Sequence, residues 1–120
     1  MFRSVPPSRP HAVLTSDNPP GFRGAFGLGR EVSPYYINRH PAPFWRLRDR
    51  FLIAPGPTVI NAIDTSEPYD YESMRFFARA GYHYILRPTR IGGRDAATIS
   101  ERSPGTTRER IIASALRDRE

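Results

Sequence analysis

The sequence predicts a mostly irregular, extended N-terminal half and a small α-rich (α+β) C-terminal half with two or three short helices and little sheet. Ten of the 13 prolines lie within residues 1–57, and each proline removes a backbone donor and fixes φ, which disfavours helices and central strands. Hydrophobic residues make up 38% of the chain and aromatic residues 12%, which is too many for a solvated tail. The clearest helical signals lie after residue 57.

Arginine supplies all of the positive charge. The chain has 18 Arg, no Lys and 12 acidic residues, a net charge of +6. Residues 1–60 hold eight Arg and three acids, whereas residues 61–120 hold ten Arg and nine acids. Arg forks to carboxylates and phosphates, stacks on aromatic faces and is enriched at protein interfaces. The basic first half is therefore a candidate for contact with a protein or a nucleic acid, although genomic base composition explains the Arg-only usage equally well.

Several classes of protein are excluded by what the sequence lacks. Without cysteine, disulfides and thiolate metal sites cannot form. No apolar run approaches the ~18 residues of a membrane span, so we expect no transmembrane segment and leave only peripheral membrane contact open. The first residues hold two Arg, three Ser and no acid before Asp17, a bias typical of transit peptides. Pro6, Pro7 and Pro10 interrupt the helix that such peptides need, so this segment is either a targeting signal or a retained arm.

Residues 1–57 are expected to form an extended arm rich in Pro, Gly and Arg. Within it, residues 21–30, GFRGAFGLGR, predict a glycine-rich loop whose GxxGxG order differs from the GxGxxG of a dinucleotide-binding turn. Arg23 and Arg30 are candidate RNA contacts beside two phenylalanines, since Arg and Phe pair with phosphates and stack on bases. A loop whose aromatic residues tuck under a protein partner is the favoured interpretation.

Residues 41–51, PAPFWRLRDRF, alternate apolar residues with arginine and fit two periodicities. As a strand over 44–52, the segment would place Arg46, Arg48 and Arg50 on one face. As a helix over about 43–53, it would start with Pro in the first turn and carry a broad apolar arc that contains Arg48. The helix is favoured. An arginine within aromatic surface is typical of a protein interface.

The candidate binding residues follow from these two patterns. The candidate partner-binding residues are aromatic or aliphatic side chains with one arginine, namely Tyr35, Tyr36, Phe44, Trp45, Leu47, Arg48 and Phe51. The candidate contacts to phosphate or RNA are the arginines Arg23, Arg30, Arg46 and Arg50.

Residues 58–120 are expected to form a small helical region. Residues 58–63 predict a short strand or one helical turn. A helix that starts near Asp70 and ends at Gly81 is then predicted, because four residues have the spacing i, i+3, i+4 and i+7 of one helix face. These residues are Met74, Phe77, Ala78 and Gly81. Residues 82–87, YHYILR, predict a strand that stops at Pro88.

A further helix is predicted near the C-terminus. Thr106 and Glu109 have the spacing of a capping box, and a narrow apolar stripe follows at Ile112, Ala115 and Leu116. Residues 95–102, DAATISER, are also compatible with a helical turn.

No pattern of catalytic or metal-binding residues stands out. The histidines, His11, His40 and His83, are never three or four residues apart, so no helical metal pair forms. The acidic residues between 64 and 72 are better explained by a solvated helix N-terminus than by acid–base catalysis. We therefore expect no catalytic residue, no metal and no cofactor.

These features predict a non-catalytic accessory subunit that staples neighbouring subunits of a large assembly. A supernumerary subunit of a mitochondrial complex, of the respiratory-chain or ATP-synthase type, would suit its moderate charge and aromatic content. Its partners would be other protein subunits. The alternative is a ribosomal or other RNA-binding protein of an organellar ribonucleoprotein, with nucleic acid as the partner. A small enzyme has no support from individual residues.

Overall fold

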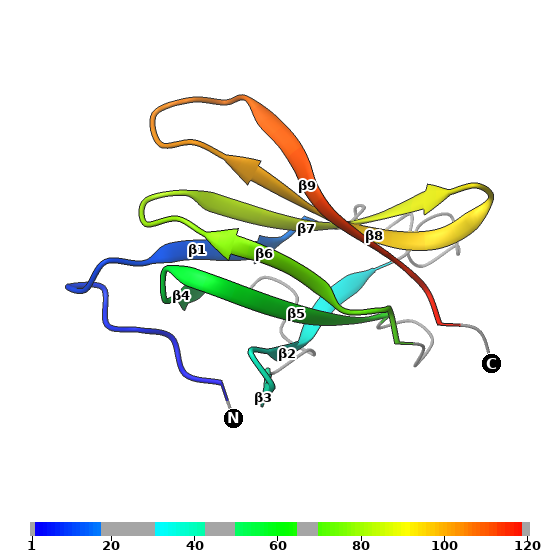
Figure 1. Cartoon of the computed structure of the whole chain (residues 1–120), viewed down its shortest axis with the longest axis horizontal. Coiled ribbons are helices and arrows are strands. Elements are labelled where there is room, and N and C mark those ends of the chain that lie inside the picture. Colours follow the sequence, from blue (N-terminus) through cyan, green and yellow to red (C-terminus); the bar gives the residue numbers. More distant parts are fainter. Residues whose placement is uncertain (1, 18–30, 43–49, 65–69, 119–120) are drawn as a thin grey trace.

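The computed structural model describes residues 2–17, 31–42, 50–64 and 70–118. These residues form nine β-strands and contain no helix. The strands are arranged in two sheets that lie against each other (Figure 1). The predicted α-rich second half, the predicted short helices and the predicted scarcity of sheet are therefore wrong. In the first half, the described residues include four strands and the start of a fifth. Within the described part of the chain, no helix is long and apolar enough to span a membrane.

The larger sheet has the strand order β4-β1-β7-β8-β9. Its strands are β1 (Ala12–Ser16), β4 (Phe51–Ile53), β7 (His83–Ile91), β8 (Arg94–Arg102) and β9 (Glu109–Leu116). The smaller sheet has the order β3-β2-β5-β6, with β2 (Val32–Ile37), β3 (His40–Pro41), β5 (Gly56–Asp64) and β6 (Met74–Ala78). Adjacent strands are antiparallel except β1 and β7, which are parallel.

Two hairpins turn through loops of two residues that both have positive φ. Asn38 and Arg39, with φ of 49° and 67°, connect β2 to β3. Gly92 and Gly93, with φ of 57° and 80°, connect β7 to β8. Positive φ at both positions is the mark of a type I′ turn, whose twist matches that of the flanking strands. These turns set the register of both hairpins.

The predicted helix from Asp70 to Gly81 is instead the strand β6 and a turn. Met74 and Ala78 are buried, whereas Phe77 is 62% exposed, which is the alternation of a strand. Residues four apart share a face in a helix and also in a strand, so the Met74–Ala78 spacing did not distinguish the two. Gly81 has the positive φ expected of a helix cap, but it lies in a turn that Tyr82 N–H closes by donating to Arg79 C=O.

The predicted C-terminal helix is the strand β9. Thr106 N–H donates to Ser103 C=O, and Gly105 has φ 71°. With Pro104 in the second position, this is a type II turn joining β8 to β9, and Thr106 closes it instead of capping a helix. The helical turn considered at 95–102 is the strand β8.

The helix predicted over 43–53 is wrong at its C-terminal end, because Phe51–Ile53 form β4. Residues 43–49 lie outside the described residues. The strand predicted at 82–87 is confirmed as part of β7, which continues through Pro88 to Ile91. Residues 58–63 lie within β5, which begins before the expected boundary at residue 57.

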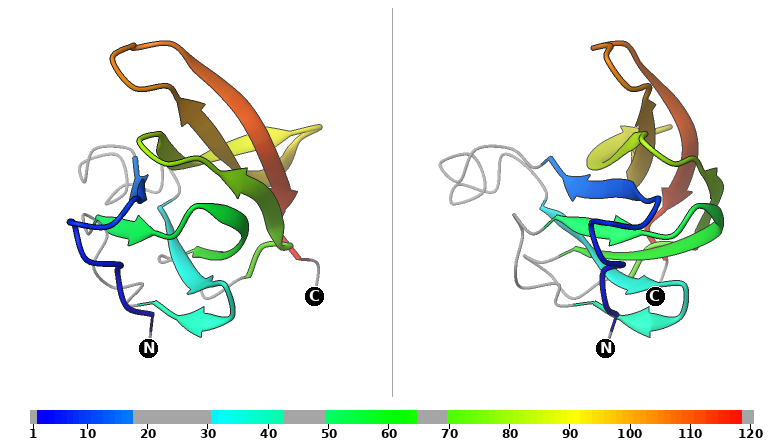
Figure 2. Two further views of the ribbon diagram at one scale, coloured as in Figure 1. Left: turned by 60° about the vertical axis from the view of Figure 1, so that its left-hand side comes forward. Right: turned by 90° about the vertical axis from the view of Figure 1, so that its left-hand side faces the viewer.

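Buried apolar side chains of both sheets meet in one core. The members that lie on different strands include Leu14, Ile37, Ile60, Met74, Tyr84, Leu86 and Ile99. The two sheets are joined at both of their edges, as Figure 2 shows from two sides. We call these joints the N-terminal seam and the C-terminal seam.

The N-terminal seam is closed by residues 2–5. Phe2 N–H donates to Pro41 C=O on β3, at 2.6 Å, and Val5 N–H donates to Leu52 C=O on β4, at 2.9 Å. The C-terminal seam is closed by residues 70–72. Tyr71 N–H donates to Ala62 C=O on β5 and Glu72 N–H donates to Leu116 C=O on β9, both at 3.0 Å. The two sheets thus form a flattened, nearly closed barrel.

We expect Gly93→Val to destabilise the protein by about 1–3 kcal/mol, because a β-branched residue is strained at positive φ. A Cβ at Gly93 meets no atom within 4 Å, so the cost is conformational. Gly93→Asn is the matched control and should cost much less, since Asn tolerates this conformation. Urea denaturation measures both, and equal costs would contradict the assigned turn.

Candidate functional sites at the two seams

A hollow lies at each seam. The N-terminal groove is lined by Ser4, Val5, Pro6, Pro7, His11, Arg50 and Leu52 and has a volume of about 580 Å³. The tyrosine pocket is lined by Tyr35, Tyr36, Asn61, Ala62, Asp70, Tyr71 and Asp118 and has a volume of about 150 Å³. Small-molecule sites usually measure about 300–1,000 Å³, so the groove is of ligand size and the pocket holds only a compact group.

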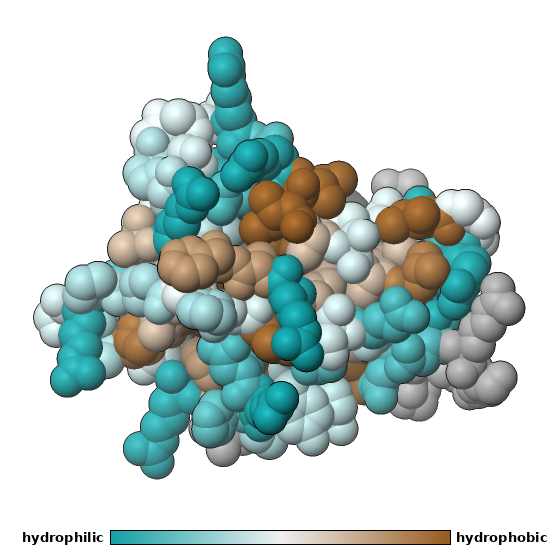
Figure 3. Space-filling view, viewed as in Figure 1, coloured by the Kyte–Doolittle hydropathy of each residue, from teal (hydrophilic) through white to brown (hydrophobic). Residues whose placement is uncertain are grey.

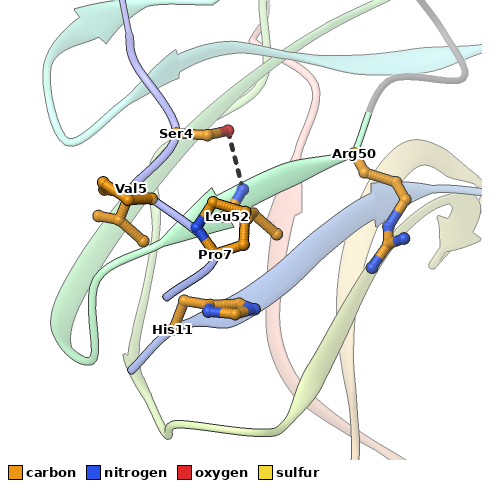
Figure 4. A pocket seen from close by; sticks show the side chains of 7 residues that line it. Ser4, Val5, Pro7, His11, Arg50 and Leu52 are labelled. Carbon is orange, nitrogen blue, oxygen red and sulfur yellow. Dashed lines mark hydrogen bonds between the residues drawn. The ribbon is translucent and has the colours of Figure 1, made fainter. Parts of the chain in front are cut away.

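The wall of the N-terminal groove is held by backbone and side-chain hydrogen bonds to β4. Leu52 N–H donates to Ser4 Oγ at 2.9 Å, the contact drawn in Figure 4, and Val5 N–H donates to Leu52 C=O. Pro6 and Pro7 fix the chain direction beyond this point because their φ is locked. The segment then turns, with Arg9 N–H donating to Pro6 C=O at 3.0 Å.

The floor and the rim of the groove differ in chemistry. The apolar residues Val5, Pro7 and Leu52 line the groove, and Figure 4 shows Pro7 and Leu52 one in front of the other with Val5 to one side. Arg50 and His11 also line the groove, and Figure 4 shows them on different sides of Pro7 and Leu52. The Arg50 guanidinium forms no hydrogen bond or ion pair with the described residues. His11 Nδ1 lies 2.8 Å from Arg9 C=O, which holds the ring in place. The groove therefore combines an apolar floor with a positive charge that no described residue neutralises.

The tyrosine pocket owes its shape to a β-bulge. Pro34 pairs with Ala62 and Tyr36 pairs with Asn61, so Tyr35 is an extra residue in β2. Consecutive residues of a regular strand point to opposite faces, and a bulge changes this direction locally. The rings of Tyr35 and Tyr36 are consequently neighbours, with centroids 4.5 Å apart and planes at 74°.

Two aspartates occupy opposite positions at the C-terminal seam. Tyr71 pairs with Arg117, and Asp118 N–H donates to Asp70 C=O at 2.9 Å, which places Asp70 and Asp118 opposite one another. Neither carboxylate forms an ion pair with the described residues. The pKa of Tyr35 is raised, mainly by its side-chain hydrogen bond with Tyr36 and by the charge of Tyr36. Burial and the charge of Asp70 raise this pKa further. The pocket is thus aromatic and negatively charged.

A buried polar network lies where β6 and β9 diverge. The Tyr84 hydroxyl donates to Glu101 Oε2 at 2.9 Å and accepts from Arg79 N–H at 2.9 Å. Glu101 is 7% exposed, and Arg110 Nη2 donates to its other oxygen at 3.2 Å. Burial raises the pKa of Tyr84 to about 12. Because Arg79 follows β6, this network ties the smaller sheet to the larger one.

A cluster of charged residues covers part of the larger sheet. Glu109 accepts hydrogen bonds from both Arg87 and Arg102, and the two guanidinium groups lower the pKa of Glu109 to about 2. Arg87 also pairs with Asp17 at 2.9 Å. His83 lies 2.7 Å from Thr15 Oγ1, and burial and the charge of Arg102 lower its pKa. In the described residues, no group of three His or acidic side chains is placed to hold a metal ion.

Some predicted site residues lie at these hollows and others do not. Tyr35 and Tyr36 lie together in the tyrosine pocket, and Arg50 lies at the rim of the groove. Phe51 is 6% exposed and packs against Phe2, with ring centroids 5.8 Å apart. The remaining predicted residues fall outside the described residues; they are Phe44, Trp45, Leu47, Arg48, Arg23, Arg30 and Arg46.

Sequence reasoning did not identify several residues of the hollows. The sequence predicts Asp70 as the start of a helix and carries no signal for Asp118. His11 and Leu52 are about 40 residues apart in the chain, and no sequence pattern indicates that they line one groove. Pro34 directly before the tyrosines was the available signal for the bulge, because Pro within a strand is found at edges and bulges.

The face in Figure 3 also carries exposed apolar side chains among hydrophilic ones. Phe77 and Ile111, 62% and 65% exposed, are the most exposed large apolar residues in the described part of the chain. Exposed apolar atoms are common on folded proteins, so these two residues carry less information about function than the hollows do.

We expect Tyr84→Phe to destabilise the protein by about 1–3 kcal/mol, since it removes the hydroxyl that accepts from Arg79 N–H and donates to the buried Glu101 Oε2. Arg110 is then the one remaining partner of that carboxylate among the described residues. Ser114→Ala, at an exposed position of β9, is the control and should have little effect. Urea denaturation measures both variants. A loss as small as that of the control would show that the network does not join the two sheets.

We expect Glu109→Gln to change how stability depends on pH. The pKa of Glu109 falls from 4.5 to about 2 on folding, so its contribution is complete above about pH 4.5 and disappears as the pH falls through about 2. The stability difference between the native protein and the variant should therefore be present near neutral pH and vanish near pH 2. Urea midpoints across this range measure it, and a constant difference would contradict the assigned cause.

A comparison of the chain with family models, curated proteins and solved structures finds no match in any of the three. No relative therefore suggests an activity, a ligand or a partner.

Proposed function

We propose that this chain is a non-catalytic accessory subunit that binds an extended, acidic segment of a neighbouring protein in the N-terminal groove. The observation that supports this most directly is the groove itself, a hollow of about 580 Å³ that is lined by apolar residues and by Arg50, which has no ion-pair partner in the described part of the chain. An extended segment could lie between residues 4–7 and β4, which both line the groove.

The floor of the groove is suited to binding because it is rigid before a partner arrives. Pro6 and Pro7 have fixed φ, and Leu52 is held by hydrogen bonds to Ser4 and Val5. Little conformational entropy is then lost on association, and preorganisation of this kind raises affinity. Apolar side chains of the partner would gain about 25 cal/mol for each Å² removed from water.

The charge of the chain favours an acidic partner. The net charge is +6, which accelerates encounters with negatively charged surfaces. Arg50 has no ion-pair partner among the described residues. Pairing with a carboxylate of the partner would therefore displace water from Arg50 and would break no contact within the described residues. Arginine is also enriched among the residues that dominate interface energies.

This proposal differs in one respect from the stapling arm expected from composition. Much of the first half contributes strands to the barrel, so the partner would meet a formed surface. The mitochondrial location and the identity of the complex stay predictions. Fluorescence microscopy of a tagged chain tests the first of them.

We expect the tagged chain to elute, after gentle extraction, in an assembly much larger than its own 13.6 kDa. Arg50→Glu should weaken its association about 10- to 100-fold, as loss of an interface arginine costs about 1.4–2.8 kcal/mol. Arg75→Glu, at an exposed position on β6, is the control. Elution as a monomer, or equal effects of both substitutions, would contradict the proposal.

The same experiment tests the RNA-binding alternative. If RNA were the partner, nuclease treatment would release the chain. Affinity for RNA would also fall by about 0.7–0.9 log units per log unit of salt for each phosphate contacted. An assembly that survives nuclease treatment with a weak dependence on salt supports a protein partner.

A further inference from the structure

We propose that the tyrosine pocket binds a single organic cation, a guanidinium or alkylammonium group such as the end of an arginine or lysine side chain. This site lies at the C-terminal seam and shares no residue with the N-terminal groove, so it stands independently of the function proposed above.

The aromatic side of the pocket is built by the bulge in β2. The extra residue Tyr35 brings its ring within 4.5 Å of the ring of Tyr36. Both residues line the same cavity. Cations within about 6 Å of a tyrosine ring are attracted by its quadrupole, so a cation in this cavity would be near two aromatic rings.

The charged side of the pocket is built by the seam. Asp118 N–H donates to Asp70 C=O, so two like charges lie opposite each other in a paired position. Such pairs are destabilising, and neither carboxylate is neutralised by an ion pair with the described residues. A cation between the two side chains would relieve this repulsion. Because both aspartates are exposed, the gain is moderated by solvent and by salt.

The volume of the tyrosine pocket and the chemical groups that line it indicate the class of ligand. A cavity of about 150 Å³ accommodates one compact group, because whole small molecules usually occupy about 300 Å³ or more. Anions are repelled by the two carboxylates. Hard divalent metals need about six oxygen ligands, and the two aspartates with Asn61 supply few of them. Aromatic rings beside carboxylates favour an organic cation.

Direct titration of the full chain tests this site. The probe is ethylguanidinium chloride at millimolar concentration and low salt, followed by isothermal calorimetry and by NMR shifts of Tyr35 and Tyr36. The matched control ligand is ethylurea, which has nearly the same shape and no charge. We expect saturable binding of ethylguanidinium that shifts both tyrosines, and no binding of ethylurea. Equal binding of both ligands would overturn the proposal.

Two variants test the assigned residues. Asp118→Asn keeps the shape of the side chain and its backbone hydrogen bond but removes one charge, and Tyr36→Leu removes one ring. Each should weaken ethylguanidinium about three- to tenfold, the range expected for an exposed charge or a cation–π contact. Asp17→Asn, which pairs with Arg87 elsewhere, should leave affinity unchanged. Thermal melting verifies that each variant is folded, and unchanged affinity in both pocket variants would overturn the proposal.

The source of the cation is distinguished by a second pair of probes. A short peptide with one arginine should bind more tightly than ethylguanidinium if the group belongs to a protein partner. Equal affinity would identify a small free cation as the ligand. Failure of both probes would overturn the site and leave the proposal for the N-terminal groove intact, because that proposal is tested with Arg50→Glu.

Discussion

Backbone hydrogen bonds of residues 70–72 join the two sheets at the C-terminal seam, and the shape of the molecule depends on them. Tyr71 N–H reaches Ala62 in one sheet, and Glu72 N–H reaches Leu116 in the other. Without these bonds β6 and β9 would be free edges over an opened core, and free edges invite pairing with other chains. The N-terminal segment closes the opposite seam in the same way, so both edges of the sandwich are covered.

Both hollows follow from this closure. A short segment that pairs with two sheets cannot keep the regular spacing of side chains on either of them, so space remains beside it. At the N-terminal seam this space is lined by Pro6, Pro7 and Leu52 together with Arg50. At the C-terminal seam it is lined by Tyr35, Tyr36 and two aspartates. The two sites have opposite charge and suit partners of opposite chemistry.

Where β6 and β9 separate, side-chain contacts hold the two sheets together in place of backbone hydrogen bonds between strands. The Tyr84 hydroxyl accepts from the backbone of Arg79 and donates to Glu101, and Phe76 packs on the ring of Tyr84 with centroids 4.7 Å apart. A buried carboxylate is costly unless its partners are present. The network is therefore a stabilising feature only while all of its members are in place, and its role differs from that of the exposed hollows.

The sequence by itself determined two local features: the strand at 82–87 and the neighbouring tyrosines of one site. It did not separate helix from strand for Met74 and Ala78, because a spacing of four puts both residues on one face in either structure. Only the tertiary structure decided that Asp70 faces Asp118 and that Ser4 contacts Leu52. Each of these contacts joins segments far apart in the chain, and the register of strand pairing that brings them together is set by packing of the whole core.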